Sequence, residues 1–211
     1  MRSAVKSLRA PSAFALLVLA LGLAIAGCGE HARLAPLPSD AVVLAVGDSL
    51  THGTGAAEEE SYPAQLERLI GRRVVQAGLP GEVTSQALKR LPQLLDEHSP
   101  RLVLLCTGGN DFLRRLGRAQ AEANVRAMVA LLRSRGIEVL LIGTPEPGIA
   151  VAAPAFFGAI AEEFRLPYEA DVIAEVLTDA RLKSDPIHPN ALGYRLIAER
   201  VAERLKQSGA I

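Results

Sequence analysis

A valine-rich run, Ala41-Val42-Val43-Leu44-Ala45-Val46, is followed at once by Gly47-Asp48-Ser49-Leu50. The apolar run predicts a buried strand, and Gly-Asp-Ser is typical of a turn. In open α/β sheets, ligands bind at the carboxyl ends of the strands. Ser49 is therefore predicted to lie where chemistry is expected, although a serine in a turn is usually only a turn residue or a helix cap.

Apolar runs alternate with helical patterns along the rest of the chain. Further strands are predicted at 74–77, 102–106, 139–142 and 166–168, and helices at 62–70, 84–98, 119–135 and 150–164, with a final helix capped by Asn190. Alternation at this spacing predicts an α/β fold, a doubly wound parallel sheet with helices on both faces.

The first forty residues have a different character. Arg2, Lys6 and Arg9 precede an uncharged apolar run at 13–26, which is too short to span a bilayer comfortably. The run ends in Ile25-Ala26-Gly27-Cys28, which resembles the bacterial lipobox and implies cleavage before Cys28 and lipidation of its sulfur. We expect a lipoprotein signal peptide at 1–27, the lipidated Cys28 and a tether at 28–40, and the folded domain at 41–211. An ordinary signal peptide, or a buried helix with an incidental cysteine, is the alternative.

Charge and cysteine content limit the partners. Loss of the leader removes three basic residues and no acidic one, which leaves 20 basic against 23 acidic residues. Without a clustered basic stripe, we expect no nucleic-acid partner. Cys106 lies in an apolar run and is predicted to be a buried free thiol, so no disulfide framework is available. The prediction is a monomer in the bacterial cell envelope, anchored to the membrane by Cys28 and facing the periplasm or the exterior.

A serine hydroxyl needs a base, and histidine is the usual one. His188 has a better context than His52, because Asp185 lies three residues before it and can fold back onto the imidazole Nδ1. That contact would orient the ring and stabilise its protonated form. The alternative is an Asp-His pair that only caps the last helix.

Acyl transfer also needs donors for the developing oxyanion. The candidates are the backbone N–H groups of Ser49 and Gly81 and the side-chain amide of Asn110, which follow the first three predicted strands. Taken one at a time, each is more simply explained as part of a turn.

Together these residues resemble the SGNH hydrolases, or GDSL esterases, which are named for Ser, Gly, Asn and His. Three strings carry the resemblance, Gly-Asp-Ser-Leu at 47–50, Gly-Gly-Asn-Asp at 108–111 and Asp-Pro-Ile-His-Pro-Asn at 185–190, and Gly81 supplies the fourth element. The resemblance implies a three-layer αβα fold with a flavodoxin-like sheet of about five strands. It also implies a triad of Ser49, His188 and Asp185, an oxyanion hole of Ser49, Gly81 and Asn110, and no metal or organic cofactor. Within the family the chain is most similar to small bacterial arylesterases and acyl-CoA thioesterase/lysophospholipases.

Other functions are less consistent with the motifs. Gly53-Thr54-Gly55 lacks the third glycine of a dinucleotide-binding loop, and Ser49 lacks the Gly-x-Ser-x-Gly context of α/β-hydrolases. A non-catalytic lipoprotein with a hydrolase-like fold remains an alternative. So does an O-acetylesterase acting on polysaccharide or peptidoglycan of the envelope.

The sequence says less about which small ester is the substrate than about the reaction. Five apolar residues either line an acyl pocket or belong to the core. They are Leu50, Phe112, Leu113, Phe156 and Phe157. Arg114 and Arg115 either meet an anionic head group or lie on a solvated face.

Overall fold

Five parallel strands form the centre of the described structure, a computed structural model that covers residues 32–148 and 151–211. They are β1 (Val43–Gly47), β2 (Val74–Gly78), β3 (Leu102–Cys106), β4 (Glu138–Ile142) and β5 (Tyr168–Glu169). Their order is β2-β1-β3-β4-β5, the flavodoxin-like arrangement, and every neighbouring pair is parallel. Every residue of β1 and β3 is buried, as expected of central strands covered on both faces.

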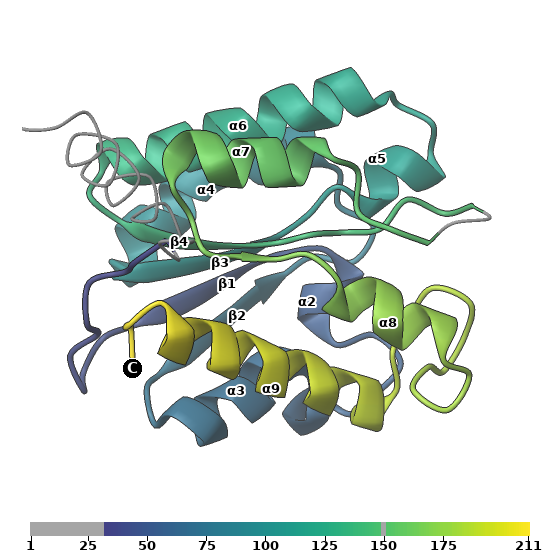
Figure 1. Ribbon diagram of the computed structural model, residues 1–211, viewed down its shortest axis with the longest axis horizontal. Coiled ribbons are helices and arrows are strands. Elements are labelled where there is room, and N and C mark those ends of the chain that lie inside the picture. Colours follow the sequence, from purple (N-terminus) through teal and green to yellow (C-terminus); the bar gives the residue numbers. More distant parts are fainter. Residues whose placement is uncertain (1–31, 149–150) are drawn as a thin grey trace, which may run out of the picture. The chain divides into compact units, whose positions relative to one another are not determined.

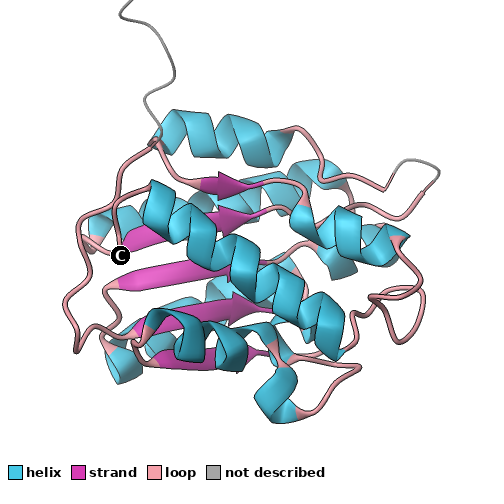
Figure 2. Ribbon diagram, turned by 60° about the horizontal axis from the view of Figure 1, so that its bottom comes forward, coloured by secondary structure: helices cyan, strands magenta, loops and turns pink. Residues whose placement is uncertain are grey.

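Helices cover both faces of the sheet (Figure 1). One face carries α3 (Tyr62–Ile70), α8 (Val172–Thr178) and α9 (Ala191–Gln207), and the other carries α4 (Thr84–His98), α6 (Arg118–Ser134) and α7 (Phe156–Phe164). Because successive side chains of a strand point to opposite faces, Val43 and Ala45 join the first core and Leu44 and Val46 join the second. Figure 2 shows the sheet lying behind the helices of one face. The predicted three-layer αβα fold is confirmed.

Short helices follow the ends of β1 and β3. They are α2 (Ser49–His52) after β1 and α5 (Gly109–Leu113) after β3. A short 3-10 helix, η2 (Glu58–Glu60), precedes α3. The turn into α2 is possible because residue 47 is glycine: a Cβ there would collide with the carbonyl oxygen of Cys106 on the neighbouring strand. We refer to the side of the sheet where β1 to β4 end as the carboxyl edge.

Several elements differ from the sequence-based prediction, and the short helices α2, η2 and α5 were not predicted. The last strand is Tyr168–Glu169 instead of 166–168. The helix predicted at 150–164 begins only at Phe156, and before it Ala152 forms an isolated bridge with Glu146. Helix α8 was not predicted at all.

The folded unit begins at Ala32, earlier than the predicted boundary at 41. Residues 32–40, which we call the N-terminal strap, lie against the domain: Leu34 and Leu37 are buried, and their N–H groups donate to the carbonyl oxygens of Ser208 and Ala210. The strap therefore does not act as a free tether. The predicted signal peptide and Cys28 lie outside the described residues. In the part of the chain that the structure describes, no helix has both the length and the apolar character needed to cross a membrane.

Candidate active site

Ser49 is the first residue of α2, and only Asp48 separates it from the end of β1. Asp48 caps this helix, because its Oδ1 accepts a hydrogen bond from the N–H of Leu50 at 3.0 Å. The helix ends after one turn at Gly53, whose φ of 96° is left-handed. On the other side, the Tyr194 hydroxyl of α9 donates to the carbonyl oxygen of Thr54 at 2.7 Å. The turn that carries Ser49 is therefore held at both ends.

His188 reaches Ser49 from the loop before α9. Its Nε2 lies 3.1 Å from Ser49 Oγ, and its Nδ1 lies 2.7 Å from Oδ2 of Asp185. The second carboxylate oxygen of Asp185 accepts the N–H groups of Ile187 and His188 at 2.8 and 2.9 Å, so the loop folds back on itself. The structure thus brings Ser49 together with the Asp185–His188 pair, which is far from it in sequence.

The pKa of Asp185 reflects these contacts. Partial desolvation acts to raise the pKa, but the hydrogen bonds from the His188 ring and from the backbone of Ile187 and His188 outweigh it and lower the pKa below its usual value. Asp185 therefore carries a negative charge at neutral pH, next to the ring nitrogen that it orients.

Two backbone donors at the carboxyl edge are unpaired. Within residues 32–148 and 151–211, the N–H groups of Ser49 and Gly81 donate to no other protein atom. Gly81 has a φ of 78° in the loop between β2 and α4, and its carbonyl oxygen accepts from Arg114 Nη2 at 2.7 Å. Unpaired donors of this kind are available to a ligand.

Asn110 lies in the first turn of α5. Its amide nitrogen donates to the carbonyl oxygen of Glu82 at 3.0 Å and more loosely to Oδ2 of Asp48 at 3.3 Å. Asn110 thereby connects the loop after β2 with the turn after β1, and it borders the same pocket as Ser49 and His188.

Asp48 is the acidic group beneath this arrangement. Burial raises its pKa to about 6; the Leu50 N–H and His188 act to lower the pKa, whereas the charges of Glu82 and Asp111 act to raise it further. The side chain is 2% exposed. The sequence predicted Asp48 only as a turn residue, and its contact with Asn110 becomes visible only when β1 and β3 lie side by side.

An open pocket of about 100 Å³ adjoins Ser49 and His188. Its walls come from the turn after β1, from α5, from the loop after β4 and from the loop that carries His188. The apolar side chains in the lining are Leu50, Leu113, Val151, Leu177 and Ile187. Most of the surface beside the serine is therefore apolar.

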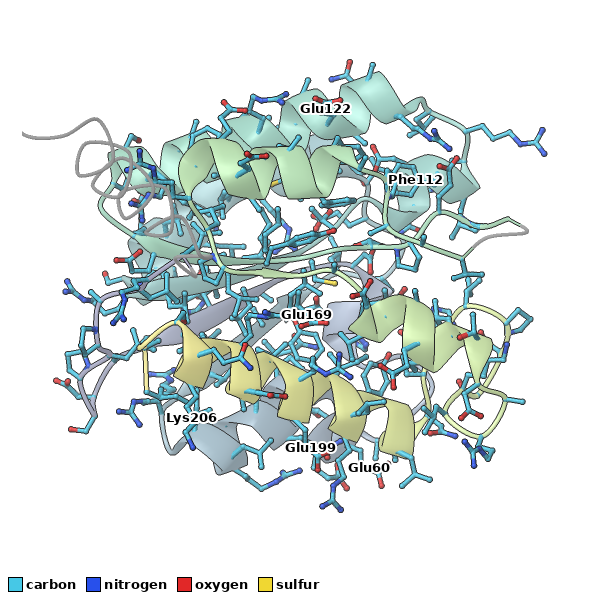
Figure 3. The ribbon with its side chains drawn as sticks, viewed as in Figure 1. Glu60, Phe112, Glu122, Glu169, Glu199 and Lys206 are labelled. Carbon is cyan, nitrogen blue, oxygen red and sulfur yellow. The ribbon has the colours of Figure 1, made fainter. Side chains whose placement is uncertain are left out.

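The sequence-based candidates for the pocket divide into two groups. Leu50 and Leu113 line it, whereas Phe112, Phe156 and Phe157 pack against one another in the core. Phe112 extends from α5 among the side chains of its helical layer (Figure 3). Gly81 is not among the described lining residues, and Arg114 is tied to its carbonyl oxygen.

Sequence reasoning missed the wall formed by the loop after β4 and by α8. Thr144 and Pro145 follow β4 directly, so the rule that strand ends gather at one edge would have found them. No sequence pattern pointed to Leu177, because the helix that carries it, α8, was not predicted.

Comparison with known proteins identifies the family. The profile of the GDSL-like lipase/acylhydrolase family matches residues 45–196, which is most of the chain. The chain belongs to this family.

Two curated members show which branch is similar. Esterase TesA of Pseudomonas aeruginosa is 29% identical over 197 residues, which cover 87% of this chain and 97% of TesA. Thioesterase 1/protease 1/lysophospholipase L1 of Escherichia coli K12 is 33% identical over 172 residues, which cover 78% of this chain and 83% of that protein. A crystal structure of TesA superposes with a TM-score of 0.70, at 29% identity and over 78% of this chain and 98% of that one. Like these GDSL members, the protein is a serine hydrolase of carboxylic esters, and it belongs to the small bacterial branch. The non-catalytic alternative is thereby set aside.

Proposed function

We propose that Ser49, His188 and Asp185 form the catalytic triad of an esterase for substrates with one flexible acyl chain, such as aryl esters, acyl thioesters and lysophospholipids. The observation that carries the proposal is the 3.1 Å approach of His188 Nε2 to Ser49 Oγ beside an apolar pocket. This distance lies within the range needed for proton transfer between base and nucleophile.

The reaction follows from these positions. Ser49 Oγ attacks the ester carbonyl carbon while His188 Nε2 takes the hydroxyl proton, and Asp185 stabilises the protonated ring. Collapse of the tetrahedral intermediate breaks the bond to the alcohol or thiol, which leaves with the proton from His188. A water molecule then attacks the acyl-serine with the same base, which releases the acid and restores Ser49.

The negative oxygen of the intermediate requires donors that are already in place. The unpaired N–H groups of Ser49 and Gly81 and the amide of Asn110 support an oxyanion hole at this point. Asn110 keeps its shorter bond to Glu82 in this scheme, and the looser contact with Asp48 is the one that the oxyanion would replace.

The choice of substrate rests on the pocket and on the relatives. Leu113, Val151 and Leu177 offer an acyl chain an apolar surface. The relatives bear the names esterase, arylesterase and thioesterase/lysophospholipase, which supports the same substrate class.

The decisive experiment measures kcat/KM for aryl esters of increasing chain length, with an acyl-CoA, a lysophospholipid and an acetylated glycan alongside. Ser49→Ala should lower kcat by roughly 10⁶-fold, the scale observed when a triad nucleophile is removed. Ser134→Ala is the control, because that hydroxyl only bonds a carbonyl oxygen near the end of α6. Wild-type turnover in Ser49→Ala would overturn the triad, and a preference for the acetylated glycan alone would favour the O-acetylesterase.

We further propose that the mature protein is held at the membrane of the bacterial cell envelope by a lipid on Cys28, on the periplasmic or external side. The support is the pattern of residues 1–28, in which basic residues are followed by an apolar run and then by Cys28. Cys28→Ser should abolish lipid labelling and release the protein from the membrane fraction. Cys106→Ala, which removes only the buried thiol, should leave both unchanged; labelling that survives in Cys28→Ser would exclude this anchor.

We propose that the active unit is a monomer, because a single chain already brings Ser49, His188 and Asp185 into contact. Light scattering of the protein without its leader tests this proposal, and a stable dimer would contradict it.

A further inference from the structure

A partly buried ion pair between Glu82 and Arg90, whose side chain is 25% exposed, lies next to the proposed oxyanion donors. Glu82, the residue after Gly81, has a side chain that is 1% exposed, and both of its carboxylate oxygens accept from Arg90 of α4. Nε of Arg90 bonds Oε1 at 2.5 Å, and Nη2 bonds Oε2 at 2.7 Å. The two-point contact fixes the orientation as well as the distance of the pair.

The same guanidinium also reaches the ends of two strands. Nη2 of Arg90 donates to the carbonyl oxygen of Ala77 in β2 at 2.7 Å, and it lies 3.4 Å from the carbonyl oxygen of Gly47 at the end of β1. One cation therefore touches the strand that leads to Ser49, the strand that leads to Gly81, and the loop that contains Gly81.

The third donor is connected through the backbone of Glu82. The carbonyl oxygen of Glu82 accepts the shorter hydrogen bond from Asn110 at 3.0 Å. A shift of Glu82 would move both its neighbour Gly81 and the acceptor that orients Asn110. Each of the three oxyanion donors is thus connected to the Arg90–Glu82 pair by a short stretch of backbone or by one hydrogen bond.

We propose that Arg90, through Glu82, is a positioning residue for the oxyanion donors: it holds the segments that carry Ser49, Gly81 and Asn110 in one frame. The inference rests on the proposed function. An ion pair that buries a carboxylate usually adds little to stability compared with apolar packing of equal volume, so we assign this pair a role in geometry. In active sites, misplacing a group by about 1 Å can cost about 10²-fold in rate.

Arg90→Lys is the first test, since lysine keeps the charge and loses the planar two-point contact. On a short aryl ester we expect kcat to fall about 10- to 100-fold with KM changed less than about 3-fold, because the substrate-lining residues are untouched. A trifluoromethyl ketone, whose serine adduct carries a tetrahedral oxyanion, should bind more weakly by the same factor as kcat/KM falls.

Arg204→Lys is a matched control. Arg204 also bonds a glutamate that is 1% exposed, Glu169, at 3.0 Å, but neither residue borders the pocket. Figure 3 labels Glu169 between the sheet and the helices of its face. This variant should keep kcat and ketone affinity, even if its melting temperature falls.

A double variant separates positioning from folding. Arg90→Met alone leaves Glu82 charged and unpaired, whereas Arg90→Met/Glu82→Gln removes both charges and should recover the melting temperature without recovering kcat. Recovery of both would overturn the proposal, as would wild-type kcat and ketone affinity in Arg90→Lys. Failure of the proposed function would be recognised separately, because Ser49→Ala would then keep its turnover in the wild-type background.

Discussion

At the scale of single residues, the carboxyl group of Asp48 lies in surroundings that disfavour a negative charge. Its pKa of about 6 lies above the ordinary value of 3.8, so the folded protein holds this proton more tightly than the unfolded chain. The resulting stabilisation is complete below about pH 4 and is lost as the pH rises through 6. Above that range, the charged carboxylate lowers the stability of the fold.

Asp48→Asn should remove this pH dependence. Relative to the wild type, its free energy of unfolding should rise by about 1–3 kcal/mol between pH 4 and pH 8, because one pKa unit corresponds to about 1.4 kcal/mol. Its kcat should fall, since Asn110 would face an amide in place of a carboxylate. Urea unfolding across this pH range measures the first effect, and Asp96→Asn, an exposed partner of Arg135, is the control. A stability difference that does not vary with pH would contradict the assignment.

Asn110→Ala tests the third oxyanion donor. Loss of one such donor costs about 10²–10³-fold in kcat, and KM should change little because the amide interacts mainly with the transition state. Steady-state kinetics on a short aryl ester provide both constants. An unchanged kcat would mean that Asn110 only shapes the start of α5.

The sequence could suggest some of these residues and not others. Asp185 lies three residues from His188, so their contact was predictable from a tight turn alone. Asp48, Glu82 and Arg90 act through contacts with segments that only the folded sheet brings together, such as Arg90 with the ends of β1 and β2. No local pattern distinguishes them from turn or surface residues.

At the scale of elements, α4 and α5 are joined by a buried polar contact. Asp111 of α5 accepts from both the N–H and the hydroxyl of Thr84, at 2.8 and 2.6 Å, and Asn124 of α6 donates to the same hydroxyl at 2.9 Å. Because Asp111 is 2% exposed, its carboxyl oxygens need these donors as hydrogen-bond partners.

Thr84→Val should lower the free energy of unfolding by about 1–3 kcal/mol, because it leaves a buried carboxylate and a buried amide short of a partner. Chemical denaturation measures the loss. Thr178→Val serves as the control, since its exposed hydroxyl bonds only carbonyl oxygens one turn earlier in α8. Equal stabilities of the two variants would show that water replaces the lost contact.

Elements with a strong apolar pattern were predicted well. Strands β1 and β3 and helices α3 and α4 agree with their patterns to within a few residues, and Asn190 caps α9 as expected, through the N–H groups of Leu192 and Gly193. The weaker cases are short: β5 has two residues and α8 has seven, too few for a period to emerge. The segment before α7 resembles a helix in composition, but in the structure Ala152 pairs with Glu146 and the helix starts only at Phe156.

At the scale of the whole molecule, the N-terminal strap contributes side chains to one of the two hydrophobic cores. Leu34 and Leu37 are 7% and 6% exposed and belong to the core that also contains α9. Sequence reasoning took this stretch for a tether because it shows no periodicity. Its two leucines are buried because they join the core that α9 covers, a contact that only the folded domain creates.

Leu37→Ala should destabilise the domain by about 2–4 kcal/mol, the usual cost of truncating a buried leucine. Thermal and urea unfolding of the protein without its leader measure this loss. Leu192→Ala, at a side chain that is 61% exposed, should change stability by less than about 0.5 kcal/mol. A loss no greater than that in Leu37→Ala would mean that the strap detaches readily in solution.

The strap also determines where the domain can be attached to something else. Its contacts lie where strands begin: Ala35 donates to Glu138 at the start of β4, and Arg72, just before β2, donates to Leu37. The pocket lies at the carboxyl edge, at the opposite ends of the same strands. The described chain therefore enters the domain at the edge of the sheet remote from Ser49. An enzyme immobilised through its N-terminus should keep its pocket open to solution, whereas one coupled through the loops around Ile187 should lose access to substrate.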